Sequence, residues 1–197
     1  MKYPNVTLEL NINLDKWAAL EFLKENKDSY VDAFYIENEE KIKRSLSKAQ
    51  QDWDIIRGDY FLEVNNLFGI SSLTSDKYTG YLSIFNFNPR FLDTKTFQFY
   101  YKHPEGTNYC IAHESMHFMF YDYIKKFGFT DEDKVWELSE IFNVIVLALP
   151  QFEELTKNPD PEPHNEHRNM IGKFKKLHEE ASDLDSFITR SFDLLQE

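Results

Sequence analysis

Two histidines one helical turn apart, with a glutamate beside the first, are the residues of this chain best suited to chemistry. They form the stretch His113-Glu114-Ser115-Met116-His117. On an α-helix, residues i and i+4 project from one face, so His113 and His117 can bind one metal ion through their ring nitrogens. Glu114 can then accept a proton from a water molecule at the metal without being a ligand itself. The spacing therefore predicts a site for one zinc ion with a general base next to it.

A third ligand is required, because a catalytic zinc ion usually has three protein ligands and a water molecule. Glu140 directly precedes the apolar run from Ile141 to Leu149. An unpaired carboxylate in such surroundings would cost several kcal/mol of desolvation, which a metal ion would offset. Glu137, one turn earlier and beside Trp136, is nearer the polar start of the same segment, where solvent would explain it more simply. We expect Glu140 to be the third ligand, with Glu137 as the alternative.

A donor that stabilises the oxyanion of a tetrahedral intermediate is a further component of such a site, and it is typically His, Tyr or Arg. His164 and His167 follow a proline-rich stretch, and either could reach the metal. We select His167 for this catalytic role, because Met170, Ile171 and Phe174 could dock the helix that it begins onto the core. The alternative for both histidines is a solvent-exposed polar loop.

The elements that must position these residues begin with a strand. Apolar residues alternate with polar ones from Val6 to Leu14, which predicts a half-buried strand, and Asp15 could cap the following helix. Residues 29–68 have apolar side chains at helical spacing, in one long helix or in two with a break at Gly58.

Two further strands are predicted before the motif. The stretch 69–80 is rich in Ser, Thr and Gly and is typical of a loop. Strands are expected at 81–88, ended by Pro89, and at 96–101, and their connection is short enough for them to pair.

The rest of the chain is expected to be helical. The motif helix should begin at Thr107 or Asn108 and end near Phe127, where Gly128 stops it. A second helix should run from a cap at Thr130 to Leu149 with its apolar part buried. Two polar amphipathic helices, at about 165–181 and 183–196, should close the chain.

Composition limits the domain organisation and the partners. The 197 residues suffice for one domain, 1–197, with a strand and helix part at 1–104 and a helical part carrying the metal site at 105–197. The net charge of −12 disfavours nucleic acid and anionic membranes as partners. The single cysteine, Cys110, fits a reducing compartment, and no apolar run reaches transmembrane length. We therefore expect a cytoplasmic protein that binds neither nucleic acid nor a membrane.

Over about residues 80–150 the chain resembles the zincin metallopeptidases, and among them the gluzincin branch, whose third ligand is a Glu on a helix after the motif helix. The resemblance rests on the strand pair, the motif helix and the segment Trp136-Glu137-Leu138-Ser139-Glu140-Ile141-Phe142-Asn143. It implies an α+β, zincin-like fold in which a small mixed or antiparallel sheet packs on the buried motif helix, with a mainly helical C-terminal half. It also implies that a strand beside that helix, here Tyr81 to Asn88, binds substrate as an added strand.

The chain departs from the best-known gluzincin pattern. Thermolysin-like enzymes carry Asn-Glu-x-x-Ser-Asp on the second helix, with the Glu as ligand and the Asp beside a histidine. Matching Ser139-Glu140 to that Ser-Asp leaves Trp136 at the ligand position, where it cannot bind zinc. Either Glu140 is the ligand in a shifted pattern, or Glu137 is the ligand and Glu140 supports a histidine.

These observations predict a zinc-dependent peptidase with one zinc ion and a peptide or protein as substrate. The alternative is a zincin-like domain that binds a metal or a partner in regulation without hydrolysing peptides. Three protein ligands and a water molecule would favour catalysis, whereas four protein ligands would favour a structural site.

Overall fold

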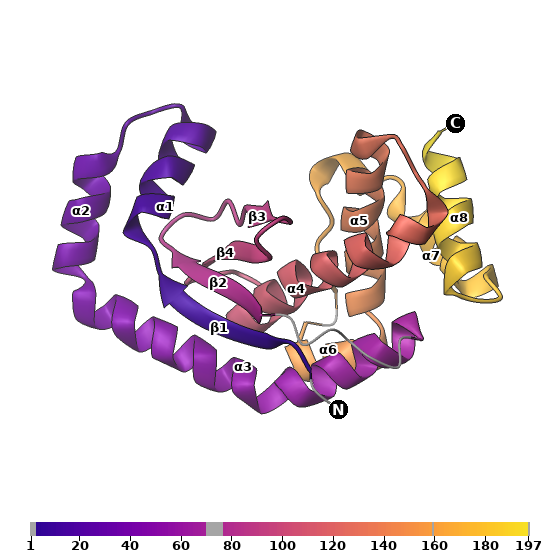
Figure 1. Ribbon diagram of the computed structural model, residues 1–197, viewed down its shortest axis with the longest axis horizontal. Coiled ribbons are helices and arrows are strands. Elements are labelled where there is room, and N and C mark those ends of the chain that lie inside the picture. Colours follow the sequence, from indigo (N-terminus) through magenta and orange to yellow (C-terminus); the bar gives the residue numbers. More distant parts are fainter. Residues whose placement is uncertain (1–2, 70–76, 159, 197) are drawn as a thin grey trace. The chain divides into compact units, whose positions relative to one another are not determined.

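The computed structural model of the chain describes residues 3–69, 77–158 and 160–196. These residues form helices and a small mixed sheet of four strands, which confirms the predicted α+β class and the mainly helical C-terminal half (Figure 1). The chain folds into two compact units. Unit 1 comprises Met1–Phe61 and Ser72–Glu114, and unit 2 comprises Leu62–Ser71 and Ser115–Glu197.

The sheet of unit 1 has the strand order β1-β2-β4-β3. Its strands are β1 (Asn5–Leu10), β2 (Lys77–Ser83), β4 (Thr96–Tyr100) and β3 (Arg90–Phe91). β2 is parallel to both of its neighbours, and β3 is antiparallel to β4. Gly80 sits in register between Leu8 and Phe97, and a Cβ there would lie 2.8 Å from both side chains. Close packing over the central strand therefore requires glycine at this position.

Among the described residues, four helical segments of unit 1 precede β2. They are α1 (Ile12–Ala18), a π-helical turn at Ala19–Leu23, α2 (Asp28–Glu37) and α3 (Glu39–Phe68), whose residues up to Phe61 belong to this unit. Figure 1 shows α3 running alongside β1. The Gln50 amide of α3 accepts a hydrogen bond from the Leu8 N–H (2.8 Å) and donates one to the Val6 carbonyl (3.2 Å). Gln50 thus satisfies the backbone along this edge of the sheet.

Asp15 joins α1 to the sheet rather than capping it. Its buried carboxylate accepts hydrogen bonds from Tyr35 Oη (2.7 Å), Ser83 Oγ (2.5 Å) and Gln98 Nε2 (2.8 Å). Burial raises the pKa of the Asp15 carboxyl, and the hydrogen bonds offset part of that effect. The predicted cap is wrong because the Asn11 side chain, which accepts from the Leu14 N–H, already begins the helix four residues earlier.

The N-terminal expectations are therefore confirmed only in part. The strand is present but ends at Leu10, since the cap at Asn11 starts α1 within the alternating stretch. The helical region 29–68 consists of two helices, and the break is at Asn38, between α2 and α3, not at Gly58. Gly58 lies inside α3, where helical φ and ψ angles are open to glycine at a modest cost.

The second strand lies earlier in the sequence than expected. β2 covers Lys77–Ser83 instead of 81–88, so residues 77–80 of the predicted loop are strand, while residues 70–76 lie outside the described residues. β2 is paired on both sides, so it cannot bind a substrate as an added strand, and that expectation is wrong. The third predicted strand is confirmed as β4, which pairs with β2 as expected.

Unit 2 is built from helices. α4 (Thr107–Ile124) enters it at Ser115 and ends in a 3₁₀ turn before Gly128, whose φ of 66° is the left-handed C-cap that the sequence predicts. α5 (Glu132–Leu147) follows, capped by Asp131 rather than Thr130, because the Asp131 side chain accepts from the Lys134 N–H. α6 (Pro150–Thr156), α7 (Ile171–Glu180) and α8 (Leu184–Leu195) complete the unit.

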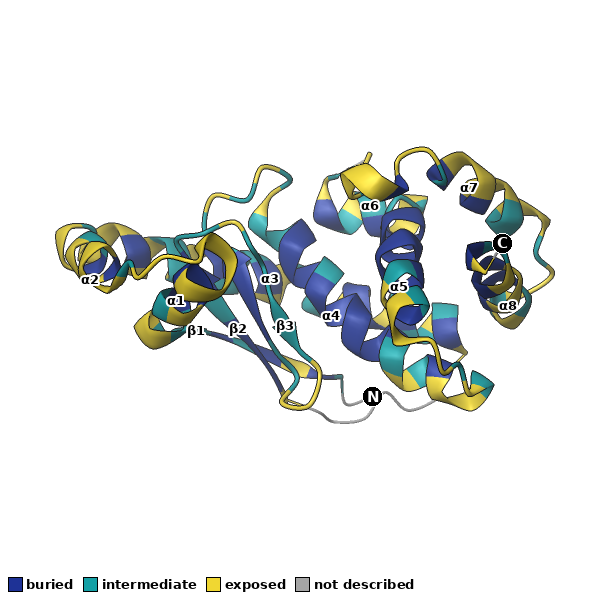
Figure 2. Ribbon diagram, turned by 90° about the horizontal axis from the view of Figure 1, so that it is seen from above, coloured by how far each residue is buried: buried dark blue, intermediate teal, exposed yellow. Residues whose placement is uncertain are grey.

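The core of unit 2 surrounds α5. Every residue from Leu138 to Leu147 is buried, as the apolar run predicts (Figure 2). Phe142 packs against Phe120 of α4 at 4.8 Å, Phe68 at 5.9 Å and Phe187 of α8 at 6.3 Å between ring centroids. Among the described helices none is long and apolar enough by itself to cross a membrane, and only α5 and α6 together, bent by 84°, meet that length and composition.

Candidate metal centre

His113 and His117 lie one turn apart on α4. The helix is uninterrupted from Thr107 to Ile124, so the spacing in the sequence becomes a shared helix face. His117 is fully buried and His113 is half-buried. The Tyr60 hydroxyl of α3 donates a hydrogen bond to the Ala112 carbonyl (2.7 Å) and thereby fixes α4 next to the motif. The first two predicted ligands are therefore held by local helical structure and by contacts of α4 with α3.

Glu140 approaches His117 from α5, within unit 2. The Glu140 Oε2 atom lies 3.5 Å from His117 Nε2, and the carboxylate is only 3% exposed. One ligand atom from each of His113, His117 and Glu140 can be chosen so that all three lie within 4.8 Å of one another. These three residues could hold a metal ion.

The geometry and the donor types fit such an ion. Two ligands bound tetrahedrally at about 2.0–2.1 Å from zinc are separated by about 3.3–3.4 Å. The distance of 3.5 Å from His117 Nε2 to Glu140 Oε2 is close to this separation of two tetrahedral zinc ligands, and it is long for a hydrogen bond. Two imidazoles and one carboxylate suit zinc and also other divalent transition metals.

Tyr109 orients the first histidine. Its hydroxyl lies 3.4 Å from His113 Nδ1, one turn earlier on α4. A metal-bound histidine commonly uses its second ring nitrogen for such a contact, which fixes the tautomer and the ring orientation. With Tyr109 at Nδ1, Nε2 of His113 is the ring nitrogen that could bind a metal ion.

Glu114, the predicted base, is buried and lies beside an arginine. Its Oε2 atom is 3.8 Å from Arg90 Nη1 of β3, and the two side chains are 5% and 13% exposed. The guanidinium places a positive charge next to the carboxylate in a region of low solvent access. Sequence reasoning did not identify Arg90, because the contact joins residues 24 positions apart through a two-residue strand.

The Glu137 side chain contacts residues other than His113 and His117. Its carboxylate lies 3.2 Å from Lys134 Nζ and 3.9 Å from His167 Nε2. The structure thus brings Glu140, and not Glu137, next to His117. The choice between the two carboxylates follows from which side of α5 faces α4.

His164, rather than His167, is the histidine next to Glu140. The His164 Nε2 atom lies 3.6 Å from Glu140 Oε2, and its ring is half exposed. His167 is buried against Trp136 at 5.8 Å, and burial lowers its pKa. The two histidines and the two glutamates share a spacing of three in the sequence, but that spacing does not say which histidine meets which glutamate; the structure pairs His164 with Glu140 and His167 with Glu137.

Cys110 takes no part in the centre. It is buried on α4, and burial raises the pKa of its thiol well above the usual range. The protonated thiol is a poor metal ligand and nucleophile, so Cys110 behaves as a small apolar residue.

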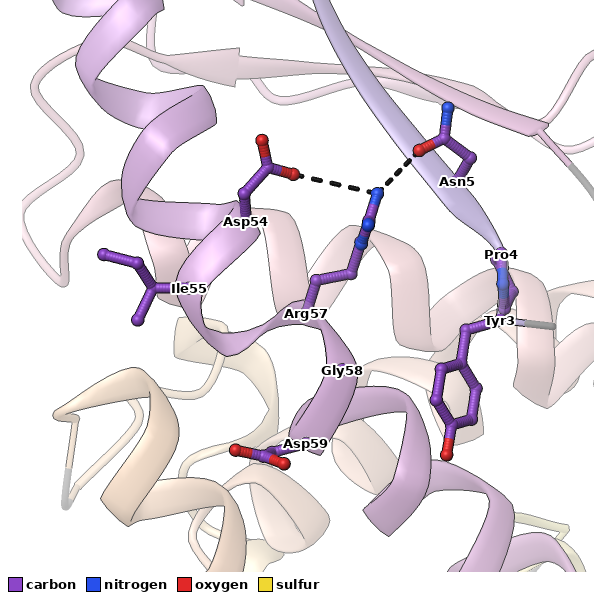
Figure 3. Close-up of a pocket in the computed structure, with 8 residues that line it drawn as sticks. All are labelled: Tyr3, Pro4, Asn5, Asp54, Ile55, Arg57, Gly58 and Asp59. Carbon is purple, nitrogen blue, oxygen red and sulfur yellow. Dashed lines mark hydrogen bonds and ion pairs between the residues drawn. The ribbon is translucent and has the colours of Figure 1, made fainter. Parts of the chain in front are cut away.

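A separate hollow in unit 1 has a different chemical character (Figure 3). It measures about 410 Å³ and lies between residues Tyr3 to Asn5 and the middle of α3. Arg57 extends across it to Asn5 Oδ1 (2.6 Å) and Asp54 Oδ1 (3.7 Å). The described residues that line it include the carboxylates of Asp54 and Asp59 but neither His nor Cys, so the two imidazoles of the metal centre have no counterpart there.

Comparison with known proteins does not assign the chain to a family. No family model matches the chain, and no curated protein or solved structure is significantly similar to it.

Proposed function

We propose that this protein is a zinc-dependent hydrolase that cleaves peptide bonds. The observation that carries the proposal is the group of His113, His117 and Glu140 with the buried carboxylate of Glu114 next to the first ligand. Three protein ligands leave a tetrahedral position open for water, whereas a structural zinc ion usually has four. A base beside the ligands has no purpose in a purely structural site.

Each residue has a distinct role in this proposal. His113, His117 and Glu140 would hold one zinc ion, which when bound supplies a Lewis acid that lowers the pKa of water and polarises a carbonyl group. Glu114 accepts a proton from the attacking water and returns it to the leaving amine. Arg90 keeps the Glu114 carboxylate oriented through its charge at 3.8 Å.

The oxyanion donor in this proposal is His164 instead of His167. His164 lies 3.6 Å from Glu140 Oε2, whereas the nearest carboxylate to His167 belongs to Glu137. A partly exposed imidazole next to a ligand can reach a substrate oxygen, and such donors typically contribute a factor of about 10² to 10³ to kcat.

Replacing Glu114 by Gln tests the mechanism. The amide keeps the size of the side chain and cannot accept the proton, so Glu114→Gln should retain zinc and lose nearly all hydrolysis of unfolded protein or peptide mixtures. Zinc content by atomic absorption and release of new amino termini measure the two properties. Glu132→Gln, an exposed position in the first turn of α5, is the matched control and should behave like the unmodified protein. A Glu114→Gln protein with unchanged turnover would exclude the mechanism.

A metal-binding domain without hydrolysis is the second candidate, and one distance favours it. His164 Nε2 is 3.6 Å from the Glu140 oxygen that also faces His117, so His164 could act as a fourth ligand. His164→Ala separates the two functions. A protein that hydrolyses peptides should keep its zinc affinity and lose kcat, while a four-ligand structural site should lose zinc.

A further inference from the structure

The segment between α6 and α7 carries His164, the proposed oxyanion donor, and has little regular structure of its own. Residues 157, 158 and 160–164 form neither a helix nor a strand, and a single 3₁₀ turn, Asn165–His167, follows them. The His164 ring is half exposed, yet its Nε2 atom lies 3.6 Å from Glu140 Oε2. Because no helix or strand fixes this position, side-chain contacts have to hold His164 there.

The buried residue of this 3₁₀ turn is His167. Its side chain is only 2% exposed, whereas the flanking Glu166 and Arg168 are exposed. The His167 ring packs against Trp136 of α5, with 5.8 Å between the ring centroids. Its Nε2 atom is 3.9 Å from Glu137 Oε1, which is too long for a hydrogen bond. Packing on Trp136 therefore anchors the turn on α5.

The anchoring ring carries no charge at neutral pH. Burial lowers the pKa of His167, so its imidazole is neutral at pH 7. Its Nδ1 atom is buried and has no hydrogen-bond partner among the described residues. A buried polar atom without a partner costs free energy. The property of His167 that stabilises this position is therefore the buried area of its ring, which an apolar ring of similar size would also provide.

The 3₁₀ turn couples the position of His164 to that of His167. The His167 N–H donates a hydrogen bond to the His164 carbonyl (2.9 Å) and closes the turn. Residues three apart in a 3₁₀ turn lie one above the other, so the two imidazoles share a side. Trp136 lies 6.0 Å from the His164 ring and 5.8 Å from the His167 ring, and the two imidazoles are 5.9 Å apart. We call these three residues, Trp136, His164 and His167, the ring cluster.

The helix that carries Trp136 also carries the third ligand. Trp136 and Glu140 are four residues apart on α5, so they lie on one face of that helix. A ring that packs on Trp136 is therefore held about one helical turn from the Glu140 carboxylate. All members of the ring cluster and Glu140 belong to unit 2, so this arrangement depends on packing within one unit.

We propose that His167 is a positioning residue that, together with Trp136, holds His164 beside the metal centre. His167 packs on Trp136, the 3₁₀ turn fixes His164 relative to His167, and His164 thereby stays next to Glu140. His167 thus acts through His164 and takes no part in the chemistry itself. The inference rests on the proposed function for the role of His164 as oxyanion donor, but the position of the His164 ring can be measured without any hydrolysis.

Nuclear magnetic resonance of the ring protons tests this position directly. In the purified protein, nuclear Overhauser cross-peaks should join the rings of His164 and Trp136, and their loss in His164→Ala identifies them. His167→Phe keeps a ring of similar size, so the cross-peaks should remain, whereas His167→Ala removes the anchor and should abolish them. Asn165→Ala, at an exposed position of the same turn, is the matched control and should keep them.

Kinetics of peptide hydrolysis separates positioning from catalysis by His167 itself. Misplacement of a catalytic group by about 1 Å can cost about 10²-fold in rate, so His167→Ala should lower kcat and kcat/KM equally, by up to about 10²-fold, while zinc is retained. His167→Phe should keep most of the rate, which a polar or proton-transferring role of His167 would not allow. In a His164→Ala background, His167→Ala should have no further effect, because it acts only through His164.

The remaining outcomes have defined meanings. Cross-peaks that persist in a folded His167→Ala protein would overturn the inference, and so would a further loss of kcat in the double variant. A His167→Phe protein that keeps the cross-peaks but is as slow as His167→Ala would assign His167 a polar role and also overturn it.

A second variant decides the question if circular dichroism shows that His167→Ala does not fold. Trp136→Leu, at a 39% exposed position, removes the other side of the anchor and should abolish the cross-peaks between the rings of His164 and His167. Their persistence in Trp136→Leu would overturn the inference. A protein that hydrolyses no peptide but shows all the expected cross-peaks would refute the proposed function and support the positioning of His164.

Discussion

Glu140→Gln is the substitution that tests the metal centre most directly. Glutamine keeps the shape of the side chain and removes the negative charge that faces His117 Nε2 at 3.5 Å. Zinc sites with four ligands bind with about 10–16 kcal/mol, or about 3 kcal/mol for each ligand. Loss of one ligand should therefore weaken zinc binding on the order of a hundredfold.

Thermal unfolding with and without zinc makes this loss measurable. At a free zinc concentration of about 100 times Kd, binding stabilises the unmodified protein by about 2.7 kcal/mol. For a chain of this length each kcal/mol raises Tm by about 2–4 °C, so zinc should raise it by about 5–11 °C. The same zinc concentration would only equal the Kd of Glu140→Gln, giving about 0.4 kcal/mol and a rise of about 1 °C.

Glu137→Gln is the matched control, on the same helix and one turn away. Its carboxylate faces Lys134 and His167, so the full zinc-dependent rise in Tm should remain. The reasoning is refuted if Glu137→Gln loses the rise while Glu140→Gln keeps it. A full rise in both variants would equally show that neither carboxylate is a ligand.

Two further predictions concern stability. Asp15→Asn should lower the free energy of unfolding in urea by about 2–3 kcal/mol, since its amide nitrogen would face donors such as Ser83 Oγ and Gln98 Nε2; a change below about 0.5 kcal/mol would contradict this role of Asp15. Burial lowers the pKa of His167, so the folded protein binds this proton less readily than the unfolded chain, and stability should fall as pH drops below the ordinary histidine pKa of about 6.5. Urea unfolding between pH 5 and 7 gives the slope of the free energy of unfolding against pH, which equals the number of protons taken up on unfolding multiplied by 2.303RT. His167→Gln should reduce this slope by the equivalent of up to about one proton, whereas an unchanged slope would assign the effect to other groups.

Local patterns accounted for the elements that carry the motif. The i, i+4 spacing, the Gly128 stop and the buried run after Glu140 depend on helical periodicity and on capping, which act within a few residues. The same reasoning was wrong at Asp15, because three residues of the stretch 11–15, Asn11, Asn13 and Asp15, could cap a helix and only Asn11 does so.

The strand β2 shows why local patterns were insufficient in the sheet. Its Gly80 is typical of a loop in sequence, but it is required where Leu8 and Phe97 meet over the central strand. Pairing between distant segments decides which residues form a central strand, and that pairing has no local signature.

The sequence alone determined that this protein has a helix with two imidazoles on one face and a carboxylate beside them, because a helix converts spacing directly into position. The tertiary structure decided which distant groups meet those residues. It brought Glu140 rather than Glu137 toward His117, His164 rather than His167 toward Glu140, and Arg90 toward Glu114. These choices depend on which sides of packed helices and strands face one another, and side-chain packing between distant segments sets those orientations.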